Sequence, residues 1–155
     1  MKVLAFLTDG FETVEALAVI DILRRANIGV DTVSITGNKS VKSAQNIIVE
    51  ADKLIDMLKV HNEAGGRIAA ICAAPSVLGK LGFLKGKRAT AFPGFEDMLE
   101  GAEVAPKTER VVTDGNITTS RGMGTSVDLG LELVTLIKGK ELADELAVST
   151  QYIND

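Results

Sequence analysis

The sequence predicts an α/β fold, a flavodoxin-like three-layer sandwich in which helices cover both faces of a mostly parallel sheet. Short apolar runs typical of buried strands alternate with longer segments of helical spacing along the whole chain. The first three elements, Lys2–Leu7, Thr13–Ala26 and Val30–Thr36, follow one another as a β-α-β unit. Strands joined in this way are parallel, so the unit sets the character of the sheet.

The first elements are marked by turn signals and by spacing. Lys2–Leu7 is an apolar run that stops at the turn signal Thr8-Asp9-Gly10. Thr13–Ala26 carries apolar residues at the spacing of one helix face, and Val30–Thr36 alternates as a strand does. Gly37–Gln45 is polar and predicts a loop.

The remaining elements continue the alternation. The predicted strands are Asn46–Val49, Ile68–Cys72, Arg88–Phe92 and a hairpin of Arg110–Thr113 with Asn116–Ser120 around Asp114-Gly115. The predicted helical segments are Asp52–Ala64, Pro75–Leu81, Phe95–Leu99, Val127–Ile137 and Lys140–Ala147. No repeat or linker separates them, so residues 1–155 predict a single domain.

Composition narrows the class of protein. A net charge of −4 and an aromatic content of 4% argue against nucleic acid or an anionic membrane as the main partner. One cysteine and one histidine exclude an internal disulfide and a Cys/His zinc site. The apolar start is too short for a signal peptide, and no run reaches the length of a membrane span. These features predict a cytoplasmic protein without a metal or cofactor.

Cys72 is the first candidate catalytic residue. It ends an apolar run and is followed at once by Ala73, Ala74 and Pro75, with proline suited to a first helical turn. A strand that turns into a helix without a loop makes a nucleophile elbow, here with a sulfur at its tip. A helix N-terminus lowers a thiol pKa, and the N–H of Ala73 is placed to stabilise an oxyanion. The alternative is a buried cysteine that acts only as a small hydrophobe.

Glu15 is the second candidate. It lies at the edge of the apolar stripe of its helix, where a carboxylate is costly unless it is paired, hydrogen-bonded or protonated. Beside a thiolate, a buried glutamate has a raised pKa, donates a hydrogen bond to sulfur and can move a proton to a substrate. The alternative is an ordinary acid at a helix start.

His61 and the glycine-bearing loop around Met123 carry weaker signals. His61 lies in a polar stretch, which predicts that its side chain is exposed to solvent. Gly122 and Gly124 flank Met123 in a loop that either binds an anion before a helix or only permits the turn. Arg121 in that loop is equally open to both interpretations.

Taken together, these motifs resemble the DJ-1/ThiJ/PfpI superfamily, and within it the DJ-1 branch. The resemblance rests on residues 9–15 (DGFETVE), 21–26 (DILRRA), 69–75 (AAICAAP) and 119–126 (TSRGMGTS). It implies a reactive elbow cysteine at Cys72, its hydrogen-bonded acid at Glu15 and an oxyanion donor at Ala73. It also implies that Arg25 lies near the site and a dimer interface, that Gly122 and Met123 line the site, and that the protein is a homodimer.

The sequence departs from the family pattern in three places. The family strand that ends in a Leu-Pro-Gly-Gly type loop, with the second oxyanion donor, has no counterpart, which predicts that a segment of roughly 25–30 residues is absent near Met57–Lys59. Omission is favoured over a true deletion, because losing a central strand leaves backbone groups unpaired; the alternative is one connecting helix over Asp52–Ala64. Phe92 stands where some relatives have histidine, and Gln45 where some have arginine.

The resemblance implies a cofactor-independent glyoxalase or deglycase that acts on small 2-oxoaldehydes through the Cys72 thiolate and Glu15. The alternative is a cysteine-based oxidative-stress sensor without turnover, because an accessible thiolate oxidises readily. A peptidase is the weaker alternative, since phenylalanine at position 92 cannot act as a base.

Overall fold

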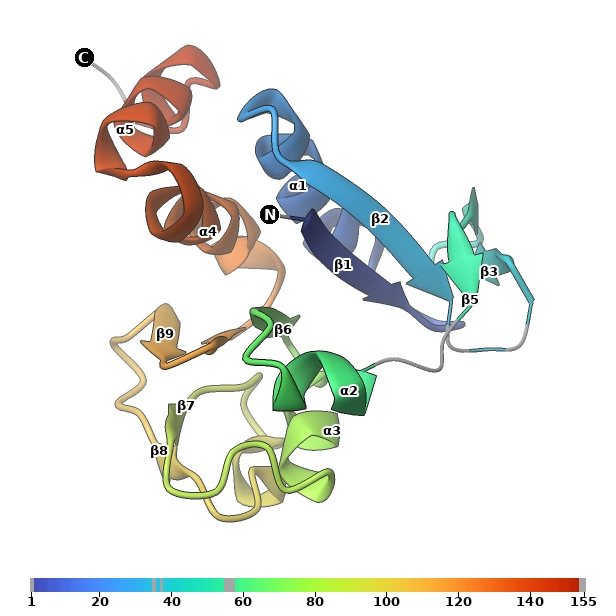
Figure 1. The fold of residues 1–155 in the computed structure, drawn as a ribbon, viewed down its shortest axis with the longest axis vertical. Coiled ribbons are helices and arrows are strands. Elements are labelled where there is room, and N and C mark those ends of the chain that lie inside the picture. The colour runs from blue at the N-terminus through green and yellow to red at the C-terminus, as the bar shows by residue number, and fades with distance from the viewer. Residues whose placement is uncertain (1, 35, 37, 55–57, 154–155) are drawn as a thin grey trace. The chain divides into compact units, whose positions relative to one another are not determined.

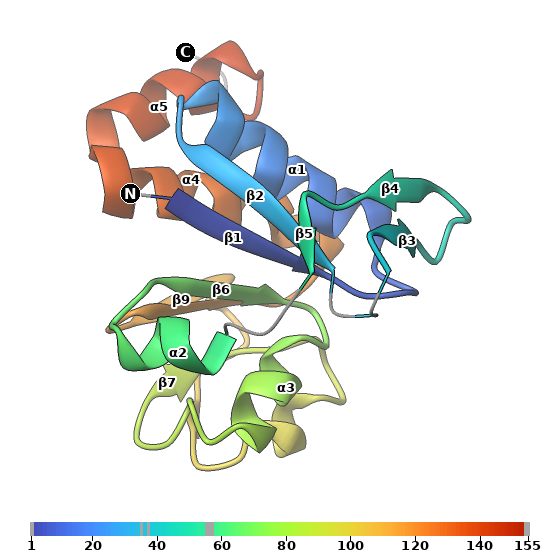
Figure 2. The ribbon, with the colours of Figure 1, turned by 45° about the vertical axis from the view of Figure 1, so that its right-hand side comes forward.

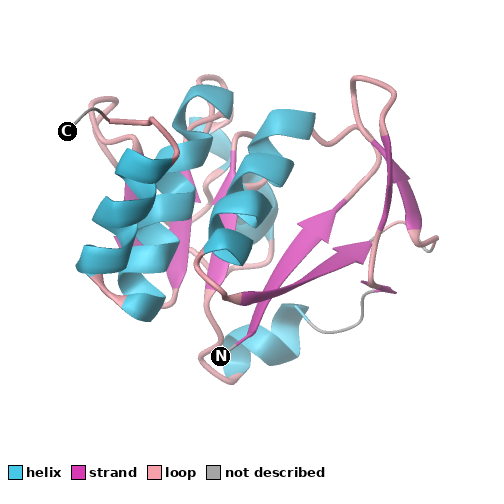
Figure 3. Cartoon of the chain, turned by 90° about the horizontal axis from the view of Figure 1, so that it is seen from above, coloured by secondary structure: helices cyan, strands magenta, loops and turns pink. Residues whose placement is uncertain are grey.

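The computed structural model describes residues 2–34, 36, 38–54 and 58–153, and within them the chain forms two compact units. The first unit is Met1–Asp56 with Gly130–Asp155, and the second is Met57–Leu129. Both units contain helices and strands, which Figure 3 colours by type along the chain. The mixed α/β class is therefore confirmed, and the prediction of one domain over residues 1–155 stays a prediction.

The first unit is built on the predicted β-α-β segment (Figure 1). Strand β1 (Lys2–Leu7) pairs in parallel with β2 (Gly29–Ser34), from Lys2 opposite Gly29 to Leu7 opposite Ser34. Helix α1 (Thr13–Arg25) connects them and lies along one face of the pair (Figure 2). The apolar spacing predicted these elements correctly because each strand and helix face is long enough to show its period.

Three strands of the first unit correct the sequence prediction. Strand β3 (Ser40–Lys42), in the segment predicted as a loop, pairs antiparallel with β4 (Ile48–Glu50), which begins two residues later than predicted. Strand β5 (Lys53–Leu54) pairs in parallel with β2, so Asp52–Ala64 is not one helix. Among the described residues of that segment, helical structure is limited to α2 (Leu58–Glu63), and the predicted break near Met57 lies outside the described residues.

Asp52, directly before β5, forms hydrogen bonds with Thr32 of β2. The backbone N–H of Thr32 donates to Asp52 Oδ2 over 2.8 Å, and the Thr32 hydroxyl donates to the same oxygen over 3.0 Å. These two hydrogen bonds, in that order, together with Arg24 nearby, hold the pKa of Asp52 below its ordinary value of 3.8.

We expect Asp52 to make the protein acid-sensitive. A lowered folded-state pKa contributes stability that is present above pH 3.8 and lost as the pH falls through the folded value. The melting temperature of wild type should therefore drop more steeply between pH 5 and 3 than that of Asp52→Asn, as followed by circular dichroism. Equal slopes would contradict this role.

The C-terminal helices complete the first unit. Helix α4 (Ser126–Lys138) begins in the second unit and continues into the first, and α5 (Lys140–Ser149) follows it. At Gly130 a β-carbon would lie 2.9 Å from Cβ of Ile22, so α4 packs closely on α1. Both helices confirm the predicted elements, and no helix in the described residues is long and apolar enough to cross a membrane.

The second unit contains a short mixed sheet. Strand β6 (Ile68–Ile71) pairs in parallel with β10 (Ile117–Ser120), which pairs antiparallel with β9 (Val111–Asp114). The predicted hairpin is confirmed, and its turn consists of Gly115 and Asn116, because Asp114 belongs to the strand. A separate parallel pair joins β7 (Arg88–Ala89) to β8 (Glu103–Val104).

Buried apolar residues of the second unit form a core cluster that includes residues of β6. Helix α3 (Pro75–Lys80) packs on the 3₁₀ turn η1 (Glu96–Met98). At Gly79 a β-carbon would lie 2.6 Å from the carbonyl oxygen of Met98, so glycine permits this contact. The cluster consists of Ile68, Ala70, Leu78, Leu84, Ala89, Ala91, Leu99 and Ile117.

The predicted continuous sheet is not seen in the described residues. There β1 pairs only with β2, and β6 pairs only with β10, so each of these strands ends a separate sheet. The helices and the parallel strand pairs within each unit follow from local patterns in the sequence.

Candidate functional site

Cys72 lies at the junction of β6 and α3 in the second unit. Its φ of +63° is in the left-handed region, which is uncommon for a residue with a β-carbon. The residues after it close tight turns: Ala74 N–H donates to the Ile71 carbonyl, and the Ser76 hydroxyl donates to the Ala73 carbonyl over 2.7 Å. The change from strand to helix therefore happens within three residues.

Two backbone hydrogen bonds hold Cys72 in this conformation. Its N–H donates to the carbonyl of Ser120 at the end of β10 over 3.0 Å, and its carbonyl accepts the N–H of Phe92 over 2.9 Å. A strained backbone conformation persists only where the surrounding structure holds it in place. Here the backbone N–H and the backbone carbonyl of Cys72 are each held by a hydrogen bond to a different segment. The Cys72 side chain is partly exposed.

These contacts bring three predicted site segments together in the second unit. Phe92 is 46% exposed, and its backbone adjoins Cys72. Ala73 is partly exposed, directly after the cysteine. The glycine-bearing loop begins at Arg121, the residue directly after Ser120, whose carbonyl accepts the Cys72 N–H.

The glycine-bearing loop closes on itself. Gly122 N–H donates to Thr125 Oγ1 over 3.1 Å, and Thr125 N–H donates to the Gly122 carbonyl over 2.8 Å. The Ser120 and Thr125 hydroxyls lie 2.6 Å apart, and Met123 is 56% exposed at the tip. These bonds fix the loop that carries Arg121 and leads into α4.

Glu15 belongs to the first unit and lies in the first turn of α1. It is 8% exposed, and its backbone N–H donates to Oε2 of Glu12, the residue that caps the helix, over 2.7 Å. Gln45 adjoins the same turn, because its Oε1 accepts both the N–H and the hydroxyl of Thr13. The first unit therefore brings Gln45 to the beginning of the helix that carries Glu15.

Arg25 lies at the opposite end of α1. Its Nε donates to Asp21 Oδ2 over 2.7 Å in an exposed pair. Ten residues of helix separate it from Glu15, about 15 Å along the axis. Within the first unit, Arg25 and Glu15 are thus not neighbours.

His61 corrects the prediction of a solvated side chain. It is half-buried, and its Nε2 lies 3.1 Å from the carbonyl oxygen of Arg67. Gly66 makes this possible, because a β-carbon there would meet the imidazole ring. No cluster of three metal-ligating side chains occurs in the part of the chain that the structure describes.

One charged pair, formed between the two segments whose backbones contact Cys72, was not predicted from the sequence. Arg121 Nη2 lies 3.9 Å from Glu96 Oε1, and both side chains are largely buried. The two residues are far apart in sequence, and no spacing rule connects them. From the sequence, Arg121 was a candidate only because it lies in the glycine-bearing loop, and Glu96 was not a candidate.

Comparison with known proteins decides the family. The sequence profile of the DJ-1/PfpI family matches residues 1–62 and 44–136. The chain belongs to the DJ-1/PfpI family. Protein dj-1beta of Drosophila melanogaster is 31% identical over 174 positions that cover 93% of both chains.

Solved structures agree with this assignment. An oxidized Toxoplasma gondii DJ-1 is 30% identical, with a TM-score of 0.89 and 99% of each chain covered. Drosophila melanogaster DJ-1beta is 29% identical, with a TM-score of 0.83 over the full length of both chains.

Proposed function

We propose that this DJ-1/PfpI family member is a cofactor-independent glyoxalase or deglycase that acts on small 2-oxoaldehydes. The observation that carries the proposal is Cys72, held at a left-handed φ at the end of a parallel strand with its side chain partly exposed. Left-handed backbone in a non-glycine residue concentrates at functional sites. A cysteine that only filled space would not need this strained position.

The proposed reaction begins with addition of the thiolate to the aldehyde carbon of methylglyoxal. A carbon–sulfur bond forms, and the carbonyl electrons move to oxygen, which the Ala73 N–H stabilises before it takes a proton. Glu15 then removes the proton from this carbon and returns it to the adjacent one. The first carbon is oxidised to a thioester while its neighbour is reduced to an alcohol, and water releases lactate and the free thiol.

The direct test is conversion of methylglyoxal to lactate by the purified protein without added glutathione or other cofactor. Stoichiometric lactate, measured by chromatography, supports the proposal. Loss of methylglyoxal without lactate would indicate binding or modification instead of turnover and would count against it.

Oxidative-stress sensing is the second candidate function. A partly exposed cysteine favours it, and a solved relative, Toxoplasma gondii DJ-1, is an oxidized form. Mild peroxide should then add two oxygen atoms at Cys72, giving a sulfinic acid detectable by peptide mass spectrometry. An unmodified Cys72 would exclude this function.

We also propose that a family segment is absent between β5 and β6. The 174 positions aligned with Drosophila protein dj-1beta exceed the 155 residues of this chain by 19, so at least that many have no counterpart here. The two overlapping profile matches support the same interruption. Detection of the contiguous tryptic peptide Leu54–Lys59 in the protein from its natural source would contradict omission, whereas peptides with extra residues between Leu54 and Lys59 would show an omitted segment.

A homodimer is proposed on the family resemblance, and light scattering of the purified protein tests it. A monomer mass at micromolar concentration would contradict it.

A further inference from the structure

We propose that Arg121 forms an anion-recognising subsite beside Cys72, so that the site favours carbonyl substrates carrying a carboxylate or phosphate group. This inference rests on the proposed function for the reacting carbon, because the anion would be a second group of the same substrate. It names a substrate class that methylglyoxal, which is uncharged, does not represent.

Backbone contacts place Arg121 and Glu96 next to Cys72. Arg121 directly follows Ser120, whose carbonyl accepts the Cys72 N–H. On the other side, Phe92 donates its N–H to Cys72, and Phe95 N–H donates back to the Phe92 carbonyl over 2.9 Å, immediately before Glu96. The cysteine therefore lies between the two segments that supply the charged pair, all within the second unit.

The guanidinium of Arg121 is buried but incompletely bonded. Its side chain is 15% exposed, and its Nη1 is buried with no hydrogen-bond partner among the described residues. The Glu96 carboxylate lies 3.9 Å away, beyond hydrogen-bonding distance. Because a buried donor without a partner is costly, a bound oxyanion would supply what this site lacks.

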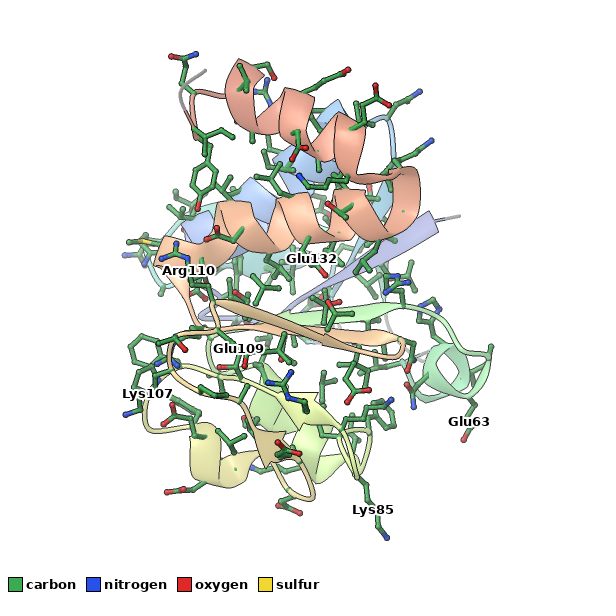
Figure 4. The ribbon with its side chains drawn as sticks, turned by 90° about the vertical axis from the view of Figure 1, so that its left-hand side faces the viewer. Glu63, Lys85, Lys107, Glu109, Arg110 and Glu132 are labelled. Atoms are coloured by element: carbon green, nitrogen blue, oxygen red, sulfur yellow. The ribbon has the colours of Figure 1, made fainter. Side chains whose placement is uncertain are left out.

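Two other arginines of the second unit are bonded closely, whereas Arg67, at the opposite end of β6 from Cys72, also has buried nitrogens without a hydrogen-bond partner. Arg110, labelled in Figure 4, contacts Asp128 over 2.7 Å at the start of α4, and Arg88 contacts Glu109 over 2.6 Å. Arg121 is less exposed than either, yet its ion pair is the longest of the three. A planar guanidinium with free N–H groups matches carboxylate or phosphate oxygens in a bidentate geometry.

Glu96 gives the subsite a counter-charge. Its carboxylate partly neutralises Arg121 and competes with an incoming anion for the same guanidinium. Removing the Glu96 charge should therefore strengthen attraction of anions, whereas removing the Arg121 charge should weaken it. A pair that only stabilised the fold would not produce opposite effects on one measurement.

The experiment compares alkylation of Cys72 by iodoacetate and by iodoacetamide, which have nearly the same shape and differ in charge. Each reagent forms a carbon–sulfur bond and releases iodide, and Cys72 is the only cysteine, so the rates report this site alone. The quantity measured is the ratio of the iodoacetate rate constant to that of iodoacetamide. It does not depend on turnover.

We expect Arg121→Gln to lower this ratio by about tenfold and Glu96→Gln to raise it severalfold, because a charge near a partly buried thiolate is weakly screened. Arg88→Gln, the matched control in the same unit, should leave the ratio unchanged. Free sulfate or phosphate should slow iodoacetate more than iodoacetamide in wild type only if the subsite binds anions.

An unchanged ratio in Arg121→Gln with Cys72 still reactive would overturn the subsite and leave the proposed function standing. If Arg121→Gln does not fold, Glu96→Gln decides, since an unchanged or lowered ratio there also overturns the proposal. A Cys72 that neither reagent alkylates would refute both this inference and the proposed function.

Discussion

Replacing Cys72 by alanine should abolish conversion of methylglyoxal to lactate. The alanine side chain has no atom that can add to an aldehyde, so turnover should fall by at least about a thousandfold. The measurement is lactate production by equal concentrations of folded wild type and variant. Full activity in Cys72→Ala would refute the cysteine mechanism.

Two variants of Cys72 can test whether the fold is preserved, because the backbone strain at this position comes from the β-carbon. Alanine keeps that carbon at φ +63°, so its melting temperature should match that of wild type. Cys72→Gly adopts the same conformation without steric cost and should be more stable than the alanine variant by up to about 1 kcal/mol. A glycine variant that is more stable but inactive would show that strain is retained for function.

The fold was predictable where the sequence shows its period over several residues. The helix from Thr13 and the two strands beside it each carry a clear pattern, and their parallel pairing follows from connection rules. Lys53–Leu54 shows no period at all, and Leu54 also matched a helical spacing with Leu58. That strand is defined by pairing with β2 and by the Asp52–Thr32 hydrogen bonds, which are long-range contacts.

The candidate site was predictable to a similar extent. Cys72 stood out because a strand, small residues and a proline leave room only for a sharp turn. The contact between Gln45 and Thr13 and the pairing of Arg121 with Glu96 depend on loops that meet only in the folded chain. A residue type alone could not reveal them, since glutamate and glutamine are common on protein surfaces.

The second large effect is expected for Glu15→Gln, which should lower methylglyoxal turnover by about 10² to 10⁴. Glutamine has nearly the same shape as glutamate and still offers a hydrogen-bond donor, but it cannot take up and return a proton. Because Glu15 is 8% exposed, a neutral side chain of equal size should be accommodated without disturbing α1. The measurement is the steady-state rate of lactate formation, with Glu141→Gln, an exposed glutamate in the first turn of α5, as the matched control.

The same variant separates proton transfer from activation of the thiol. If Glu15 moves protons, Glu15→Gln should lose turnover while iodoacetamide still alkylates Cys72 within a fewfold of the wild-type rate. If Glu15 mainly sustains the thiolate, alkylation and turnover should fall together. Turnover equal to wild type would remove Glu15 from the mechanism and leave it as a buried acid whose backbone is held by Glu12 at the start of a helix.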